Sequence, residues 1–402
     1  MTSDSDAAAP LAGVTVIDLG QVLATPFATY LLALLGAEVV KIEPLDGEWL
    51  RKGMNPLSFA TQNAAKKSLA VDLRAPGGSE VVLRLAEQAD VFVEGFAPGT
   101  ADDMGLGWDV ISARSPSIVY GSLSAFGETG PYGGRPGFDH VVQAVSGIMP
   151  ATGFEGQPPT KVGSPYLDYG GGLLLAFGIL AGILEQRRTA KAVHIDVSML
   201  DAGLLLNAGA LVRTANTGAN PPRTGNEAFS GAVASGAFAT TDAMLMVAAN
   251  KTRHFVELMK ILDLDDLADT PELASPNADR VQVADAKRRM GERFATNSAQ
   301  YWETLLADAK IPAARVRSLN EVTGEGHPAA RGTLQPLANT TDGPNNGATL
   351  LPGAGVQING VMPGPYGQVP DIGAHTTEVL TRWGFSPGEI ADLAGCGVIG
   401  GP

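Results

Sequence analysis

Short apolar runs rich in β-branched residues alternate with apolar helical segments through the first third of the chain. Residues 14–19 have the pattern of a buried strand, and residues 27–35 that of an apolar helix that Gly36 is placed to end. Residues 37–43 are then predicted to form a second strand. Two strands joined by a helix in this way lie parallel in one sheet. The pattern recurs, with strands at 68–73, 90–94 and 117–123 and a helix at 78–89. It predicts an α/β fold built on a doubly wound parallel sheet.

The turn after the first strand does not have the signature of a dinucleotide site. Residues 18–26 read Asp-Leu-Gly-Gln-Val-Leu-Ala-Thr-Pro, without the Gly-x-Gly-x-x-Gly pattern that such a site needs. The chain also lacks the Gly-x-x-x-x-Gly-Lys-Ser/Thr loop of nucleotide triphosphate sites. Chemistry that depends on NAD is therefore disfavoured.

Beyond residue 197 the character of the sequence changes. Residues 199–214 are predicted to form one apolar helix. From residue 232 to about residue 314 strands are followed by amphipathic helices, which is typical of a smaller α+β unit. Two domains are also what a length of 402 residues favours.

Charge and cysteine content limit the partners and the compartment. The chain has 28 Lys and Arg against 42 Asp and Glu, a net charge of −14, which disfavours nucleic acid and anionic membranes as partners. Cys396 is the single cysteine, so neither an internal disulfide nor a cysteine metal site is expected, and we expect a cytoplasmic protein that binds no metal. The uninterrupted apolar stretches are shorter than the roughly 18 residues of a membrane span. No membrane-spanning segment is predicted.

One carboxylate stands out at the mouth of a long apolar segment. Asp168 precedes Gly170, Gly171 and Gly172, and the apolar run 173–184 is predicted to be a helix buried on all sides. A carboxylate near a helix N-terminus tends to stay ionised, and an ionised, positioned carboxylate can attack acyl groups. The alternative is an Asp that only caps a core helix.

Several segments together resemble the class III CoA-transferases, a family that includes formyl-CoA transferase, carnitine CoA-transferase and α-methylacyl-CoA racemase. The matching segments, in family order, are 36–44, 67–73, 89–94, 126–132, 137–144, 161–184, 193–199 and 373–380. Each match alone is weak, but the ordered set covers nearly the whole chain. The resemblance implies a ring-shaped chain that interlocks with a second copy as a homodimer. It also implies a large Rossmann-like domain of residues 1–205 and 330–402, a small α+β domain of residues 220–325, and linkers at 206–219 and 326–329.

The resemblance also implies a reaction. Asp168 matches the family's nucleophilic aspartate, which passes CoA from an acyl-CoA donor to a carboxylate acceptor through an aspartyl anhydride and an aspartyl-CoA thioester. Asp139 matches an acidic residue close to the nucleophile, and we expect it to support Asp168. No permanently bound cofactor is implied, because CoA is a substrate. The residues expected to contact CoA or its acyl group are Ala24, Leu73, Arg74, Gly95, Phe96, Arg135 and Phe138.

Some cations of the family pattern are missing here. Residues 94–99 read Glu-Gly-Phe-Ala-Pro-Gly instead of Glu-Asn-Phe-Arg-Pro-Gly, so Ala97 replaces an arginine. Asp103 stands where another arginine is usual, and Asn-Ala-Ala-Lys66 replaces Asn-Arg-Gly-Lys. The cations that remain as candidates for the phosphates of CoA are Lys66, Lys67, Arg74, Arg135 and Lys161.

Two other functions stay open at this point. A racemase of the same fold would exchange the α-proton of a 2-methylacyl-CoA with a His–Asp pair, but Phe138 occupies the histidine position and Asn250 stands near the position of a further acid. Both differences count against racemase chemistry. A repurposed, non-catalytic member would explain the missing cations. Residues 225–231 are expected to form a loop on the acceptor side.

Overall fold

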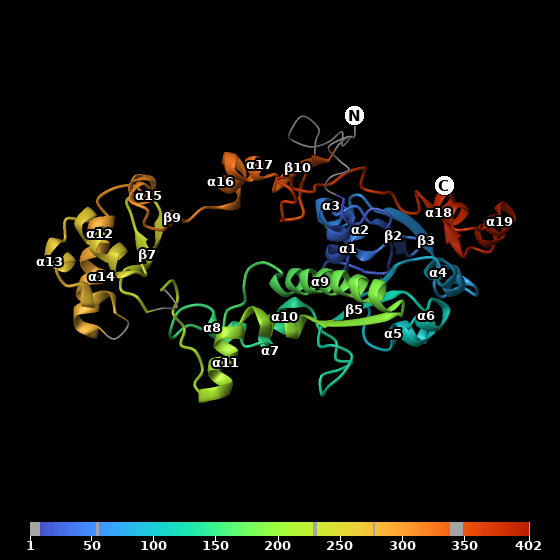
Figure 1. The fold of residues 1–402 in the computed structure, drawn as a ribbon, viewed down its shortest axis with the longest axis horizontal. Helices are drawn as coiled ribbons and strands as arrows, with labels where there is room; N and C mark the ends of the chain where they lie inside the picture. Colours follow the sequence, from blue (N-terminus) through green and yellow to red (C-terminus); the bar gives the residue numbers. More distant parts are fainter. Residues whose placement is uncertain (1–8, 54–55, 228–230, 276–277, 338–348, 402) are drawn as a thin grey trace. The chain divides into compact units, whose positions relative to one another are not determined.

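The computed structural model of the protein describes residues 9–53, 56–227, 231–275, 278–337 and 349–401. The chain divides into two compact units (Figure 1). Unit 1 comprises Met1–Ile148, Lys161–Gly218 and Gly326–Pro402, and unit 2 comprises Met149–Thr160 and Ala219–Glu325. Residues 228–230 of the expected acceptor-side loop lie outside the described residues.

Unit 1 is built on a seven-stranded sheet in the order β12-β3-β2-β1-β4-β5-β6. All neighbours are parallel except β12, which runs antiparallel to β3. The strands are β1 (Thr15–Asp18), β2 (Glu38–Glu43), β3 (Lys67–Val71), β4 (Val91–Glu94), β5 (Val119–Ser124), β6 (Val193–Ser198) and β12 (Ile399–Gly400). The prediction of an α/β fold on a mostly parallel sheet is confirmed. The strand order reverses between β1 and β4, and a doubly wound sheet binds its ligands at such a reversal.

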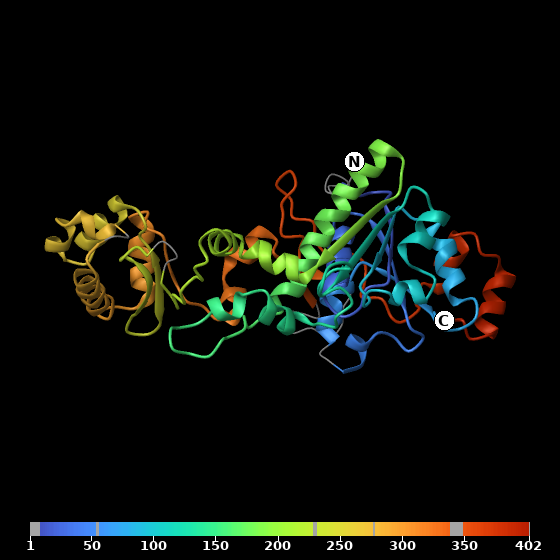
Figure 2. The same ribbon diagram turned by 90° about the horizontal axis from the view of Figure 1, so that it is seen from below.

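Helices cover both faces of this sheet. Successive strand residues alternate between two cores: Val16 packs with one helix layer and Ile17 with the other. The first layer contains α1 (Ala24–Leu34) and α9 (Tyr166–Thr189), and Figures 1 and 2 show α9, in green, along β5 and β6. The second layer consists of α4 (Gly78–Ala86), α6 (Trp108–Arg114), α18 (Thr376–Arg382) and α19 (Pro387–Gly395).

Glycines bring α9 close to its neighbours. A Cβ on Gly172 would lie 2.5 Å from the carbonyl oxygen of Ala24 in α1. A Cβ on Gly182 would lie 2.7 Å from a methyl of Val119 in β5. Neither the backbone of α1 nor the packed strand β5 can move without a large cost in free energy. A larger residue at either glycine would therefore push α9 away from α1 and the sheet.

The burial of α9 differs from the prediction. Leu173, Phe177 and Leu184 are between 54% and 70% exposed, whereas Leu175 and Ile179 are fully buried. The helix is buried on one side only, because the sheet, α1 and the helix that begins at Met199 leave its other side uncovered. By length and composition α9 could cross a membrane, with 24 residues and a mean hydropathy of 1.7 over its most apolar window. The sequence had not predicted such a segment, but a core helix of a folded domain passes the same test.

Unit 2 has its own small sheet and core. The antiparallel strands β7 (Ser235–Ala239), β8 (Met244–Ala248) and β9 (Ala313–Arg315) lie in that order. The helices α12 (Thr252–Ile261), α14 (Arg280–Phe294) and α15 (Ala299–Asp308) supply Phe255, Phe294 and Trp302 to the core.

The division into units differs from the expected boundaries in three places, one of which is that residues 326–329, expected to be a linker, belong to unit 1. Residues 149–160 belong to unit 2, to which they are hydrogen-bonded. The Arg223 side chain donates to the carbonyl of Pro150 at 2.7 Å, and the N–H of Gly225 donates to the carbonyl of Gly153 at 3.1 Å. The expected single helix 199–214 breaks at Asn207 into α10 (Met199–Leu206) and α11 (Ala208–Thr217), and α11 belongs to unit 1 rather than to a linker.

Candidate active site

Asp168 is the third residue of α9 and opens onto a cavity of about 560 Å³ in unit 1. Pro165 precedes the helix and has no side-chain group that could cap it. The cavity is lined by Val22, Trp49, Phe138, Asp139, His140, Lys161, Gly163, Ser164, Pro165 and Asp168. The two carboxylates expected at the site are thus brought together, and Phe138 lies with them. We call this the Asp168 cavity.

Asp139 holds the backbone that carries Asp168. It begins α7 (Asp139–Val145), and its side chain is buried. One carboxylate oxygen accepts the N–H of Leu167 at 2.6 Å, and the other accepts from the amide of Gln143 at 2.6 Å. The amide oxygen of Gln143 in turn accepts the N–H of Val162 at 2.8 Å. This chain of hydrogen bonds fixes the segment that leads into Asp168.

The protonation of Asp168 differs from the expectation. Burial raises the pKa of its carboxyl to about 7, and the negative charge of Asp139 adds to the rise. The favourable field of the α9 N-terminus does not prevent this. Because nucleophilicity of a carboxylate increases with its basicity, an anion with this pKa is a better nucleophile than an ordinary aspartate.

A strained turn forms another wall of the cavity. Val22 has a φ of +66°, in the left-handed region that a β-branched residue rarely adopts. Its N–H donates to Glu48 at 3.3 Å, and Glu48 is paired with Lys41 at 3.2 Å. Lys41 also donates to the carbonyl of Gly20 at 2.8 Å. The side chains of Lys41 and Glu48 are both buried. Their ion pair therefore fixes the turn at two points, the carbonyl of Gly20 and the N–H of Val22.

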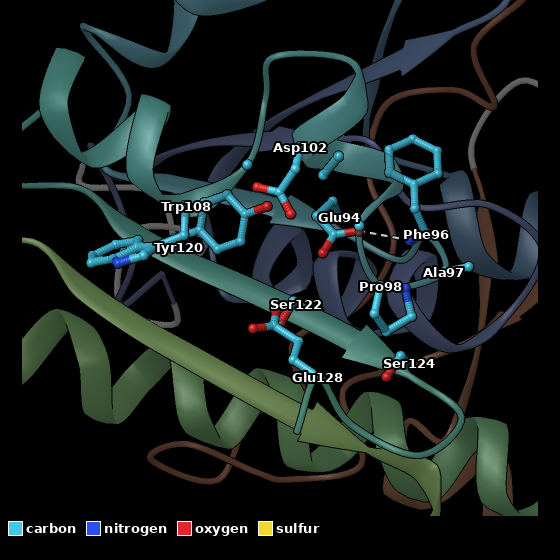
Figure 3. A pocket seen from close by; sticks show the side chains of 13 residues that line it. Glu94, Phe96, Ala97, Pro98, Asp102, Trp108, Tyr120, Ser122, Ser124 and Glu128 are labelled. Carbon is cyan, nitrogen blue, oxygen red and sulfur yellow. Dashed lines mark hydrogen bonds between the residues drawn. The ribbon is translucent and has the colours of Figure 1, made fainter. Parts of the chain in front are cut away.

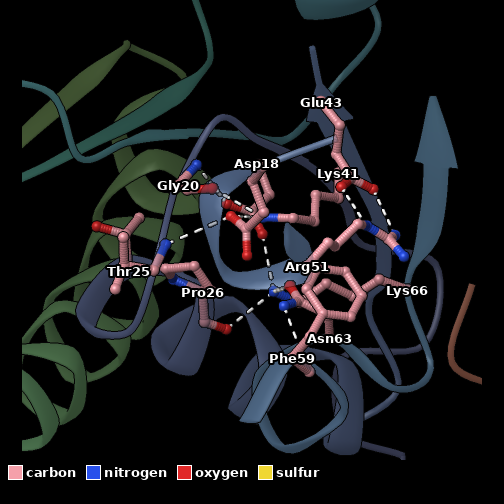
Figure 4. A network of polar contacts seen from close by, with 12 residues as sticks. Asp18, Gly20, Thr25, Pro26, Lys41, Glu43, Arg51, Phe59, Asn63 and Lys66 are labelled. Carbon is pink, nitrogen blue, oxygen red and sulfur yellow. Dashed lines mark hydrogen bonds and ion pairs between the residues drawn. The ribbon is translucent and has the colours of Figure 1, made fainter. Parts of the chain in front are cut away.

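Lys66 is part of a buried network and is unsuited to bind phosphate. Its ammonium donates to Asp18 at 2.8 Å, to the carbonyl of Pro26 at 2.9 Å and to Asn63 at 3.0 Å (Figure 4). The prediction that Lys66 could bind a phosphate of CoA is therefore wrong, because all the N–H donors of its ammonium already have partners inside the protein. Lys67 is paired with Glu38 and Glu378.

Three of the other expected CoA contacts line a second cavity, of about 600 Å³. Leu73, Arg74 and Phe96 line it, at the carboxyl ends of β2, β3 and β4. Gly95 approaches α1 so closely that a Cβ would lie 2.4 Å from the hydroxyl of Thr25, the residue after Ala24. Ala24 itself is buried at the start of α1.

Arg135 lies apart from this group. Its guanidinium stacks on the ring of Tyr132 at 4.2 Å, and it is not among the residues that line either cavity.

A third cavity, of about 180 Å³, is acidic (Figure 3). Glu94, Asp102 and Glu128 line it together with Trp108 and Tyr120. Burial raises the pKa of the Glu94 carboxyl to about 7, and the charge of Glu128 contributes. Lacking a lysine or arginine among its lining residues, this cavity is a poor place for the phosphates of CoA.

Comparison with known proteins identifies the family. Residues 11–376 match CoA-transferase family III. The chain belongs to this family. The resemblance drawn from the sequence is thereby confirmed, and the chain is a class III CoA-transferase enzyme acting on CoA thioesters.

Relatives of known name match over most of their length. A succinyl-CoA:glutarate CoA-transferase of Mus musculus is 32% identical over an alignment of 408 residues that covers 99% of this chain and 92% of that protein. An acetyl-CoA:oxalate CoA-transferase of Acetobacter aceti is 33% identical over an alignment of 359 residues that covers 87% of this chain and 90% of that protein. A crystal structure of a CaiB/BaiF family protein from Brucella suis superposes with a TM-score of 0.81, at 26% identity, over 93% of this chain and 99% of that one.

The structure of this family III chain adds site residues that sequence reasoning missed. Val22 and Trp49 line the Asp168 cavity, and Gln143 links Asp139 to the backbone at Val162. The conformation of Val22 has no signature in the sequence. The spacing of Asp139 and Gln143 by four residues, on one face of a helix, was the one signal that could have paired them.

Proposed function

We propose that this enzyme moves CoA between carboxylic acids through covalent intermediates on Asp168. The observation that carries the proposal is a partly buried carboxyl with a pKa of about 7 on an open cavity, held in place through the backbone by Asp139 and Gln143. A carboxylate that serves only as a helix cap needs neither a cavity nor a second buried acid behind it.

The chemistry runs in four balanced steps. The Asp168 carboxylate attacks the thioester carbonyl of an acyl-CoA, and CoA thiolate leaves, forming a mixed anhydride. The thiolate then attacks the aspartyl carbonyl, which releases the first carboxylic acid as its anion and leaves an aspartyl-CoA thioester. An acceptor carboxylate attacks that thioester and expels CoA thiolate, which forms a second anhydride between the acceptor and Asp168. The returning thiolate attacks the acceptor's acyl carbon and restores Asp168. One thioester replaces another, so the exchange is close to balanced in free energy.

The relatives and the second cavity support the assignment of donor and acceptor. The relatives' names pair an acyl-CoA donor, succinyl-CoA or acetyl-CoA, with a carboxylate acceptor, glutarate or oxalate. We assign the second cavity, lined by Leu73, Arg74 and Phe96, to the CoA moiety. Arg74 lines this cavity and is then the cation that can bind a CoA phosphate, because Lys66 and Lys67 are paired with carboxylates of the protein.

Chemical trapping tests the covalent step. The purified protein is mixed with a panel of acyl-CoAs, quenched with hydroxylamine and digested, and the peptides are examined by mass spectrometry. We expect a hydroxamate on Asp168, because hydroxylamine attacks both anhydride and thioester. Labelling of another carboxylate, with Asp168 unmodified for every donor, would refute the assignment.

The pH profile is a separate prediction. Because Asp168 must be ionised to attack and its pKa is about 7, kcat/KM should rise about tenfold per pH unit up to pH 7 and then level off. Measurement from pH 5 to pH 9 with a subsaturating donor checks this. A carboxyl with its ordinary pKa would be ionised throughout that range, so a flat profile would contradict the prediction.

Gln143→Leu should damage catalysis without touching the cavity wall. The change removes the donor to Asp139 and the acceptor of the Val162 N–H, so the segment before Asp168 is released. We expect kcat to fall about 10- to 100-fold and the free energy of unfolding to fall by about 1–3 kcal/mol. Steady-state kinetics and chemical denaturation measure the two effects. The exposed Gln282, changed to Leu, is the control and should alter neither.

We also propose that the protein is a homodimer. The family resemblance implies one, and the exposed apolar side chains of α9 and α10 support it: Leu173, Phe177, Leu184, Leu205 and Leu206. A single soluble chain rarely exposes so many. Size-exclusion chromatography with light scattering should give twice the chain mass, and Phe177→Asp should shift it toward the monomer. Val281→Asp, at an equally exposed position of α14, should have no effect. A monomeric wild type would contradict the proposal.

A further inference from the structure

The Asp168 cavity has mainly apolar walls. The indole of Trp49, the ring of Phe138 and the side chain of Val22 all line it, together with Pro165. Trp49 and Phe138 are 60% and 69% exposed, so their faces are available to a ligand and are not used in the core. The ring of His140 lies nearly parallel to that of Phe138, with 6.4 Å between centroids, and extends the aromatic wall.

Positive charge is scarce in this cavity. Lys161 is the one lysine or arginine among the described residues that line it. Its side chain is exposed and donates to the carbonyl of Val162 at 3.3 Å. A solvated lysine stabilises a partner anion weakly. A short dicarboxylate would find only this solvated lysine as a cation for its second carboxylate among the described residues that line the cavity.

We propose that the acyl group exchanged on Asp168 belongs to a monocarboxylic acid with a flat apolar body, such as an arylalkanoic acid. The inference rests on the proposed function and goes beyond it, because the relatives compared above are named for short polar acids. A flat ring can stack on Trp49 and Phe138, and such stacking adds binding free energy beyond that of burying apolar surface. An apolar body also displaces water from the cavity. A cavity of about 560 Å³ accommodates a ring and a short chain. A four-carbon diacid would leave most of the cavity wall in contact with water.

The test compares two donors in one assay. 3-Phenylpropanoyl-CoA and succinyl-CoA are each mixed with the enzyme, and kcat/KM for formation of the Asp168 hydroxamate is measured. We expect the aryl donor to be favoured at least about 100-fold. Trp49→Ala and Phe138→Ala should each lower the rate of the aryl donor about 10-fold or more and change that of succinyl-CoA less than about threefold.

Controls separate the outcomes. Tyr301→Ala removes a half-exposed ring from unit 2 and should change neither rate. Because Trp49 and Phe138 are exposed, their alanine variants should keep the wild-type melting temperature. A preference for succinyl-CoA that is lost in Lys161→Ala would overturn the inference and leave the transferase function intact.

A binding measurement keeps the inference testable if the chemistry fails. Absence of a hydroxamate with every donor would overturn the proposed function. Calorimetric titration of Asp168→Asn with 3-phenylpropanoate and with succinate then decides the ligand class independently of catalysis. Binding of the aryl acid at least about 10-fold more tightly supports the inference, and equal or tighter binding of succinate overturns it.

Discussion

Asp168→Asn is expected to abolish CoA transfer, with kcat at least about 1,000-fold below that of the wild type. The amide has the shape of the carboxylate but cannot attack a thioester, so neither anhydride nor aspartyl-CoA can form. Conversion of one acyl-CoA into another, followed by chromatography, measures the loss. The melting temperature should be unchanged or slightly higher, because the raised pKa shows that the site disfavours a charge at this position.

The matched control is Asp109→Asn. Asp109 also lies in the first turn of a helix, α6, but it is exposed. Its variant should retain wild-type kcat. Transfer above about one tenth of the wild-type rate in Asp168→Asn, after exclusion of deamidation by mass spectrometry, would show that Asp168 is not the nucleophile.

Lys66→Met should have the largest effect on stability. The change deletes an ammonium with several buried acceptors and leaves the Asp18 carboxylate, 0% exposed, without its counter-charge. Breaking a buried ion pair on one side costs about 3–5 kcal/mol. Chemical denaturation should show a loss of this size in the free energy of unfolding. The neighbouring Lys67→Met removes only partly exposed pairs and should cost less than about 1 kcal/mol.

A second variant sharpens this test. In Asp18→Asn combined with Lys66→Met, no unpaired charge remains, so part of the lost stability should return. If Lys66→Met were no more destabilising than Lys67→Met, the buried network of Figure 4 would not be a stabilising element of unit 1.

The sheet was predictable because its strands carry a local signal. Parallel strands covered on both faces are nearly continuous apolar runs, as at β1 and β4, and these can be recognised without knowledge of the fold. The two residues of β12 have no such pattern. They form a strand only because the C-terminal segment reaches β3, which is a matter of long-range packing.

The candidate site was predictable as a set of residues but not as an arrangement. The ordered family segments single out Asp168 and Asp139. Their link through Gln143 and the N–H of Leu167 became visible only in three dimensions. The ionisation of Asp168 was misjudged for the same reason: the helix N-terminus is local, whereas burial and the charge of Asp139 come from the fold.

The sequence by itself determined the fold class, the family and the carboxylate on which the chemistry is proposed to depend, because strand periodicity and ordered motifs are properties of the chain. Only the tertiary structure decided which cations remain free to bind a ligand. Lys66 and Arg74 have the same charge in the sequence, yet one is enclosed by acceptors and the other lines a cavity. Only the tertiary structure, likewise, placed Trp49 and Phe138 in one cavity with Asp168. Desolvation and proximity depend on residues distant in sequence, and no local pattern records them.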